Sequence, residues 1–459
     1  MEQKLHFIGI GGIGMSAIAQ IMLGQGFDIS GSDLQQNRFT EMLSGLGARI
    51  YYGHSPHNLP PATEAVVYSS AVTGENLEIR EARRRGLPVY KRAQMLAYLI
   101  SCKRSIGVAG AHGKTTVSGM IAAMLELSGR EPTIIIGGML PIIASNAKAG
   151  AGPFLVAEAD ESDGTFLLLK PEIAVITNIE VDHLDHYHSL DDIKKSFAQY
   201  LRQIPPAGFA VVCADCPNVR ELVAAVPGRY ISYALHEQAR YRAARISHSP
   251  FGVAADIYDN GAVLGRLDLM TPGEHNILNA LAAVAVGREL ELDFAEIAGA
   301  LGRFSGTGRR FELLGEAAGV TVVDDYAHHP TEVAATLQAA RAMDDSRRVV
   351  AVFQPHRYTR TQVMYGDFAR AVMLADAVVI QELYPAFEQP IAGVSARLIV
   401  DEALRLGYDN ISYAATEEQT LAVLQQLLKP RDLLLIMGAG NIRSVGERYL
   451  EIEGGLYDK

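Results

Sequence analysis

The chain has 459 residues, more than a single hydrophobic core accommodates, so two to four domains are expected. Its apolar fraction of 49% and charged fraction of 20% are typical of a soluble globular protein. The net charge of −11 argues against broad binding of nucleic acids or anionic membranes, and no stretch is apolar enough to span a bilayer.

The N-terminus and the cysteines indicate a cytoplasmic protein. Residues 1–7 lead directly into a strand pattern and lack the charged start and cleavage site of a signal peptide. Three cysteines cannot form a disulfide framework. Cys213 and Cys216 lack the second Cys or His pair that a zinc site needs, so we expect unpaired thiols.

The first block, residues 1–104, shows the alternation of strands and helices that is typical of α/β domains. A strand at 5–8 is followed by a glycine loop, a helix to about residue 24 and a strand that ends near Asp33. The GxGxxG spacing and Asp33 predict a diphosphate at the helix N-terminus, with contacts from Gly11, Gly12 and Gly14. The same pattern suits an NAD-dependent oxidoreductase, which therefore remains an alternative.

A further strand of this block, at 65–68, ends at Ser69 and Ser70. Their hydroxyl groups either add contacts to the same ligand or are ordinary turn residues. The polar segment 101–104 is expected to be a linker to the next block.

The second block, residues 105–307, opens with a strand at 105–109, a glycine-rich loop and a helix. Such a loop lets backbone N–H groups and the helix N-terminus converge on phosphate oxygens. Lys114 can place its charge at the β- and γ-phosphates, and the hydroxyl of Thr115 suits Mg²⁺. Val108 replaces the first glycine of the standard GxxxxGK[ST] pattern, so the loop is shorter. The alternative is an ordinary turn with a surface lysine, but Gly-Lys-Thr at this junction favours nucleotide binding. The predicted loop contacts are Gly110, Ala111, His112, Gly113, Lys114, Thr115 and Thr116.

Acidic residues gather after the next predicted strand, at 154–157. Glu158 ends this strand, and in a parallel sheet that end faces the phosphate loop. Asp160, Glu161 and Asp163 follow, and such a concentration of carboxylates is unfavourable unless a cation lies among them. Glu158 is therefore predicted to bind Mg²⁺, with a solvated acidic loop as the alternative.

Two polar groups lie farther along this block. His183 follows a strand at 173–177 and either binds a second divalent ion, positions a reactant or is structural. His275, Asn276 and Asn279 begin a helix, and an Asn amide can pair with an adenine edge. On spacing alone, a cluster that caps the helix backbone is the preferred interpretation.

The third block, residues 308–459, contains predicted strands at 320–323, 349–353, 377–380 and 433–437. Two loops that follow strands are rich in His, Arg and Asp, which suggests a binding site at the carboxyl edge of the sheet. Arg357 and Arg360 can clamp a carboxylate or phosphate bidentately. Arg310 is expected to reach the nucleotide. The predicted pocket residues in the first of these loops are Tyr326, His328 and His329.

With these residues in view, the chain resembles the Mur ligase family over essentially its whole length. The resemblance rests on motifs that occur together in this order: GIGGIGMSA at 9–17, GAHGKTT at 110–116, EADESDGTF at 158–166, TNIEVDHLDHY at 177–187, HNILNALAA at 275–283, DDYAHHPTE at 324–332 and FQPHRYTRT at 353–361.

The resemblance implies a three-domain α/β fold. An N-terminal Rossmann-like domain, 1–104, would bind the UDP part of UDP-N-acetylmuramate. A central domain resembling P-loop ATPases, 105–307, would bind ATP. A C-terminal Rossmann-like domain, 308–459, would bind L-alanine. The implied enzyme is an ATP-dependent ligase of peptidoglycan precursor synthesis, a monomer or weak homodimer without nucleic-acid partners or membrane insertion.

The resemblance also implies roles for particular residues. Lys114 would stabilise the γ-phosphate, Thr115 and Glu158 would hold one Mg²⁺, and His183 a second. His275, Asn276 and Asn279 would then contact the adenine nucleotide. The residues implied at the amino-acid or sugar-nucleotide side are Tyr326, His328, His329, Arg357 and Arg360. Two alternatives remain: a ligase that reattaches a recycled tripeptide to the same sugar nucleotide, and a non-catalytic nucleotide switch.

Overall fold

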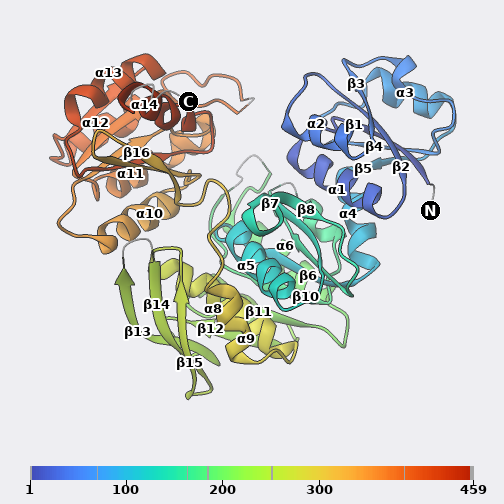
Figure 1. Ribbon diagram of the computed structural model, residues 1–459, viewed down its shortest axis with the longest axis horizontal. Helices are drawn as coiled ribbons and strands as arrows, with labels where there is room; N and C mark the ends of the chain where they lie inside the picture. Colours follow the sequence, from blue (N-terminus) through green and yellow to red (C-terminus); the bar gives the residue numbers. More distant parts are fainter. Residues whose placement is uncertain are drawn as a thin grey trace. The chain divides into compact units, whose positions relative to one another are not determined.

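The computed structural model describes residues 3–69, 71–162, 164–182, 186–249, 252–386 and 388–454 (Figure 1). The chain divides into two compact units. Unit 1 comprises Met1–Val181, Ser189–Arg242 and Ala280–Ala300, and unit 2 comprises Asp182–His188, Ala243–Asn279 and Leu301–Lys459. Across the described ranges, no helix combines the length and apolarity needed to cross a membrane.

Unit 1 begins with a parallel sheet in the order β3-β2-β1-β4-β5. Its strands are β1 (Lys4–Ile8), β2 (Asp28–Asp33), β3 (Arg49–Tyr52), β4 (Ala65–Tyr68) and β5 (Val89–Lys91). Its helices are α1 (Ile13–Gly24), α2 (Arg38–Gly45), α3 (Leu77–Arg84) and α4 (Arg92–Ser101), with a 3₁₀ turn η1 (Pro56–Asn58). The strand order reverses at β1, and ligands of doubly wound folds bind beyond the carboxyl ends of strands at such a switch point.

The predicted linker at 101–104 is wrong in its extent. Ser101 is the last residue of α4, and Arg104 is the first residue of the next strand. Polar composition suggested a linker, but the helix ends with a polar residue and the strand begins with one. Only residues 102 and 103 separate the two elements.

The larger sheet of unit 1 runs in the order β13-β12-β11-β10-β6-β9-β7-β8. Its strands are β6 (Arg104–Ala109), β7 (Thr133–Leu140), β8 (Ser145–Lys148), β9 (Phe154–Glu158), β10 (Ile173–Ile176), β11 (Phe209–Cys213), β12 (Tyr230–Ala234) and β13 (Tyr241–Ser249), which continues into unit 2. Where register is resolved, the pairs are parallel except for β7 with β8. The carboxyl ends of β6, β9 and β10 therefore lie at one edge of adjacent strands.

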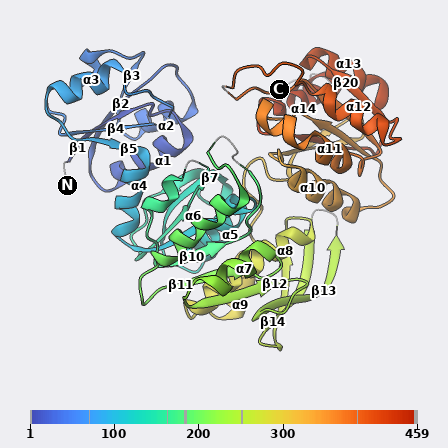
Figure 2. The same cartoon turned by 180° about the vertical axis from the view of Figure 1, so that it is seen from behind.

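Helices cover both faces of this sheet. They are α5 (Lys114–Leu127), α6 (Leu190–Arg202), α7 (Pro217–Ala225), α8 (Glu274–Glu289) and α9 (Phe294–Leu301), with 3₁₀ turns η2 (Pro141–Ile143) and η3 (Thr165–Leu168). Figure 1 shows α5 in front of the strands, and Figure 2, from behind, shows α6 and α7. Strands that are buried on both faces have continuous apolar sequences, as Ile173–Ile176 does.

Unit 2 contains the hairpin of β14 (Gly252–Asp259) and β15 (Ala262–Leu269) and a sheet in the order β16-β17-β21-β18-β19-β20. The strands are β16 (Glu312–Ala317), β17 (Val320–Asp325), β18 (Val349–Phe353), β19 (Ala377–Gln381), β20 (Ile411–Ala414) and β21 (Leu433–Met437). The helices are α10 (Pro330–Met343), α11 (Tyr358–Val372), α12 (Arg397–Arg405), α13 (Glu417–Leu427) and α14 (Arg443–Glu453).

Alternate residues of this sheet enter two separate cores. Val349, Ala351 and Phe353 of β18 pack in the core that includes α10, α11 and α12. Val350 and Val352 pack in the core that includes α13 and α14. This layering of helices on both faces of a mostly parallel sheet is the predicted α/β architecture.

Candidate active site

The phosphate loop connects β6 to α5, and its glycines are required by its geometry. Gly110 has a φ of +138°, and a Cβ there would lie 2.1 Å from the Thr177 hydroxyl oxygen. Gly113 has a φ of +82° and precedes the first residue of α5. Residues with a Cβ rarely adopt such angles, so both positions need glycine.

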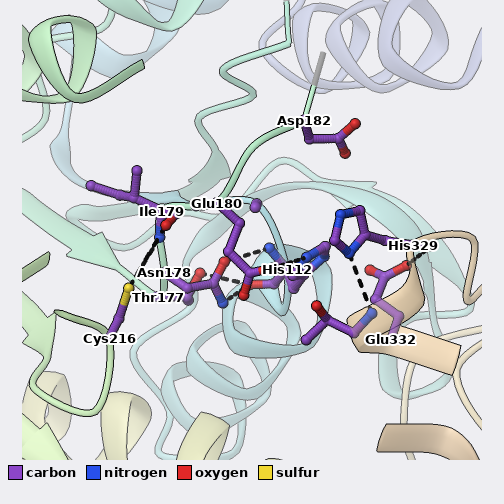
Figure 3. A network of polar contacts seen from close by, with 12 residues as sticks. His112, Thr177, Asn178, Ile179, Glu180, Asp182, Cys216, His329 and Glu332 are labelled. Carbon is purple, nitrogen blue, oxygen red and sulfur yellow. Dashed lines mark hydrogen bonds and ion pairs between the residues drawn. The ribbon is translucent and has the colours of Figure 1, made fainter. Parts of the chain in front are cut away.

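The end of β10 fixes the shape of this loop, as the close-up shows (Figure 3). The Thr177 hydroxyl donates to the His112 carbonyl at 2.6 Å. The Asn178 amide donates to the same carbonyl at 3.1 Å, and its oxygen accepts from the His112 N–H at 2.8 Å. Asn178 thus pairs with the loop backbone in both directions. Sequence reasoning missed this role, although Thr177 is the last residue of a predicted strand and Asn178 directly follows it.

Lys114 lies inside the loop rather than at the surface. Its ammonium group donates to the carbonyls of Gly110 at 2.6 Å and Ala111 at 3.3 Å, and to Glu161 Oε1 at 2.9 Å. Burial acts to lower the pKa of Lys114, but the charges of Glu161 and Asp160 outweigh it and raise the pKa above its usual value. The lysine is therefore cationic, which contradicts the alternative of an ordinary surface lysine.

Glu158 ends β9, beside β6, and faces the start of α5. Its Oε2 accepts from the Thr115 hydroxyl at 3.2 Å, and its Oε1 accepts from the Gly137 N–H at 2.5 Å. Burial raises the pKa of this carboxyl, although Gly137 and Lys114 oppose the shift. A buried carboxylate beside a hydroxyl group is the hard-oxygen donor set that Mg²⁺ prefers. The residues present therefore fit a divalent cation.

Three residues that the sequence singled out lie outside the described residues: Ser70, Asp163 and His183. The metal and catalytic roles of His183 and the substrate contact of Ser70 therefore remain predictions. Thr116, at the start of α5, is buried.

The N-terminal glycine loop is organised around Asp33. The carboxylate of Asp33 accepts from the Gly11 N–H at 2.7 Å, and the Gly12 N–H donates to the Gly9 carbonyl at 3.3 Å. A Cβ at Gly9 would lie 3.0 Å from the Cβ of Ser69. The structure thus brings the loop, Asp33 and Ser69 together. Because Asp33 anchors the loop itself, a contact from it to a ribose stays a prediction.

Gly14, the third glycine of that loop motif, lies in the first turn of α1. A Cβ at Gly14 would lie 3.3 Å from two side-chain atoms of Arg92, Cδ and Nη1. Sequence reasoning missed Arg92 because it lies 78 positions beyond Gly14 at the start of another helix. Its cationic group adds positive charge beside the helix N-terminus.

Aromatic and imidazole rings gather after β17 and β18 in unit 2. The ring centroid of His328 lies 5.4 Å from that of Tyr326 and 5.9 Å from that of His356. His356 in turn stacks on Tyr384 at 5.6 Å. Burial lowers the pKa of His328 to about 3 and that of His356 to about 4, so both are neutral near pH 7. Tyr384 was not predicted.

The expectation that Asp324 and Asp325 follow a strand is wrong, since both belong to β17. The apolar run ends at Val323, but the strand continues because each carboxylate has partners. Asp324 pairs with Arg309 at 3.2 Å and Arg443 at 3.1 Å. Asp325 accepts the N–H groups of residues 311 and 327.

Three predicted pocket residues have partners within unit 2. Arg360 forms an ion pair with Asp182, in which Nη2 lies 2.8 Å from Oδ1 and 3.1 Å from Oδ2. Both residues are buried. The His329 ring accepts from the Thr331 N–H at 3.4 Å at the start of α10. Arg357, with a φ of +75°, is the N-cap residue of α11, and its N–H donates to the Tyr384 carbonyl at 2.9 Å. The bidentate clamp predicted for Arg360 therefore forms on a carboxylate of this chain.

The residues predicted near adenine lie at the start of α8. Asn276 is buried, and its amide donates to the Pro272 carbonyl at 2.7 Å. Asn279 donates to the Asn276 side chain at 3.3 Å. These contacts support the interpretation that the cluster secures the helix start, and the adenine contacts remain a prediction.

Arg310 lies in the same unit as this helix start. Burial and then the charge of Arg310 lower the pKa of His275 to about 4. The Arg310 guanidinium lies 5.5 Å from the Tyr326 ring centroid and 3.5 Å from Glu332. Its predicted nucleotide contact stays a prediction.

Comparison with known proteins gives consistent matches along the chain. Residues 4–104 match the family model described as "Mur ligase family, catalytic domain", residues 108–287 the "Mur ligase middle domain" and residues 309–440 the "Mur ligase, glutamate ligase domain". A curated UDP-N-acetylmuramate–L-alanine ligase from Geobacter sp. strain M21 is 47% identical over 448 residues, which cover 98% of this chain and 97% of that protein.

Two solved structures extend the comparison. The UDP-N-acetylmuramate-alanine ligase MurC from Thermotoga maritima superposes with a TM-score of 0.83 at 31% identity, covering 98% of both chains. A murein peptide ligase from Psychrobacter arcticus 273-4 gives a TM-score of 0.71 at 23% identity, covering 100% of both chains. The second similarity is informative about the fold alone.

Proposed function

The chain belongs to the Mur ligase family, and we propose that it joins L-alanine to the lactyl carboxylate of UDP-N-acetylmuramate at the expense of ATP, in peptidoglycan precursor synthesis. The observation that carries the proposal is the placement of Lys114, Thr115 and Glu158 around one phosphate loop. The 47% identity to a curated ligase of this name supports the choice of substrates.

A ligase that reattaches a recycled tripeptide is the alternative within the family. The murein peptide ligase shares the fold at 23% identity, whereas the alanine ligase of Thermotoga maritima shares 31%. The higher identity favours L-alanine as the acceptor. An oxidoreductase is less consistent, because the glycine loop at 9–14 occurs here together with a second, phosphate-binding loop.

The first chemical step activates the carboxylate. An oxygen of the lactyl carboxylate attacks the γ-phosphorus of ATP, ADP leaves, and a mixed anhydride, an acyl phosphate, forms. Lys114 holds positive charge where negative charge develops on the transferred group. Thr115 and Glu158 are proposed to hold Mg²⁺, with His183 at a second ion. When bound, Mg²⁺ neutralises charge on the phosphate oxygens.

The second step forms the amide bond. The neutral amine of L-alanine attacks the acyl carbon, a tetrahedral intermediate collapses, and inorganic phosphate leaves. The amine enters as an ammonium group and must lose a proton, because only its neutral form has a free electron pair. Exclusion of water protects the acyl phosphate from hydrolysis.

The remaining site residues are proposed as binding groups. Gly11, Gly12, Gly14, Asp33 and Ser69 would surround the diphosphate and ribose, where Arg92 adds positive charge. The amino-acid and carboxylate contacts are assigned to Tyr326, His328, His329, Arg357 and Arg360, and the adenine contacts to His275, Asn276, Asn279 and Arg310. The proposed domain boundaries remain 1–104, 105–307 and 308–459.

Phosphate release tests the proposal. We expect release from ATP only when Mg²⁺, UDP-N-acetylmuramate and L-alanine are all present. The tripeptide L-alanyl-γ-D-glutamyl-meso-diaminopimelate in place of L-alanine should give no more than background. Release that is faster with the tripeptide would contradict the assignment, and release from ATP alone would indicate a nucleotide switch.

A further inference from the structure

The ammonium group of Lys114 has an acceptor for each of its three N–H bonds. Two acceptors are neutral carbonyls of the loop itself, Gly110 and Ala111, at 2.6 and 3.3 Å. The third is the carboxylate of Glu161 at 2.9 Å. Since an ammonium group has three donors, a phosphate oxygen can be bound only by replacing one of these acceptors.

Of the three acceptors, a phosphate displaces Glu161 most readily, because the net charge around Lys114 then changes least. Its side chain is 4% exposed and that of Lys114 is 15% exposed, so the pair is largely withdrawn from water. Replacing one anion by another keeps the ammonium group neutralised. Retaining both anions at one cation would bring like charges together, which is strongly unfavourable in a poorly solvated site.

Displacement of the carboxylate also changes the balance of charge around Glu161. Glu161 lies in the acidic segment that also contains Glu158 and Asp160, and the charges of all three act on Lys114. Once the ammonium group binds phosphate, it neutralises these carboxylates less, and the phosphates add negative charge beside them. A divalent cation that arrives with the nucleotide would offset this added negative charge.

We propose that Glu161 is a positioning residue that exchanges its ion pair with Lys114 for the cation that accompanies the nucleotide, and so makes nucleotide binding depend on Mg²⁺. The inference rests on the proposed function, since it assumes that Lys114 binds a nucleotide phosphate. It assigns Glu161 a role in controlling affinity. Without Mg²⁺, the Glu161 carboxylate competes with phosphate for the ammonium group.

Calorimetric titration of the full-length protein with the non-hydrolysable analogue AMP-PNP tests this role. Each protein is titrated once in EDTA and once in MgCl₂. In Glu161→Gln, affinity in EDTA should rise roughly tenfold to a hundredfold, the strength of one charge-assisted hydrogen bond. In MgCl₂ the gain in affinity should be smaller. The ratio of the dissociation constant in EDTA to that in MgCl₂ should therefore be lower in the variant than in the wild type.

Glu172→Gln serves as a matched control, because Glu172 forms an ion pair with Arg104 at 2.8 Å away from the loop. Its ratio of dissociation constants should equal that of the wild type. Should Glu161→Gln fail to fold, Glu161→Asp decides by the same criterion, since its shorter side chain weakens the ion pair but keeps the charge. A smaller rise in EDTA affinity is then expected.

The outcomes separate this inference from the proposed function. If the wild type binds the analogue with Mg²⁺ but the folded Glu161 variant keeps the wild-type ratio, the inference is wrong and the function stands. If the wild type binds no nucleotide under either condition, the proposed function itself is wrong.

Discussion

Lys114 combines a chemical role with a structural one, and replacing it should affect both. Lys114→Met removes the charge but retains most of the apolar stem. We expect ADP formation to fall by roughly a hundredfold to a thousandfold, as for other groups that stabilise developing charge. We also expect a loss of about 3 kcal/mol in the free energy of unfolding, because the substitution breaks the largely buried ion pair between Lys114 and Glu161.

The double variant Lys114→Met with Glu161→Gln distinguishes these roles. It should recover most of the free energy of unfolding, measured by urea denaturation, while ADP formation stays low. Recovery of both quantities would contradict a chemical role for Lys114. Recovery of neither would show that the ion pair is not what the first substitution disrupts.

His328 makes stability depend on pH. Burial lowers its pKa to about 3, against an ordinary value of 6.5. Between these values the unfolded chain binds the proton and the folded chain does not, so stability is full above pH 6.5 and falls with decreasing pH. From pH 6 to pH 5 the wild type should lose up to about 1.4 kcal/mol more than His328→Asn. Urea unfolding of both proteins measures the difference, and parallel pH curves would contradict it.

At the scale of elements, the contact between the segment after β10 and the phosphate loop should affect both stability and nucleotide affinity. Asn178→Ala removes both hydrogen bonds to the His112 backbone. We expect a loss of about 1–2 kcal/mol in stability and weaker binding of AMP-PNP. Asn218→Ala is the control, because the Asn218 amide donates to the Ile179 carbonyl at 2.8 Å in the adjacent loop segment. Its stability should fall comparably while nucleotide affinity is retained, as titration calorimetry would detect.

The elements themselves were largely predictable from local patterns. Short apolar runs bounded by polar residues or Gly gave β4, β18 and β21 with their observed bounds. The proximity of Lys114 and Glu158 was also predictable, because Glu158 ends β9, Lys114 lies beyond the end of β6, and the carboxyl ends of these strands share one edge of a parallel sheet. The local sequence pattern was sufficient to predict a residue's position where the regular geometry of a strand determines it.

Contacts that depend on the path of a loop were not predictable. The pairing of Glu161 with Lys114, and of Asp182 with Arg360, joins residues 47 and 178 positions apart. The sequence showed each charge but not its partner. For Arg360 the guanidinium was assigned to a substrate, whereas a carboxylate of the same unit lies within its reach.

At the scale of the whole molecule, ligand binding should stabilise the protein selectively. UDP at a hundredfold excess over its dissociation constant should raise the free energy of unfolding by about 2.7 kcal/mol. NADH should give no comparable shift, because a diphosphate site specific for UDP leaves the nicotinamide half without contacts. Thermal unfolding with each ligand measures this, and stabilisation by NADH alone would revive the oxidoreductase alternative.

Unit 1 is built from separated stretches of chain, and the last of them is Ala280–Ala300. In that stretch, Gly287 lies against Met124 of α5, because a Cβ at Gly287 would approach the Met124 sulfur to 2.7 Å. During translation, therefore, the side of α5 around Met124 lacks this contact until Gly287 has left the ribosome. A message cut short between codons 243 and 279 would yield a product with that apolar surface exposed, and quality-control proteases would recognise it as incomplete.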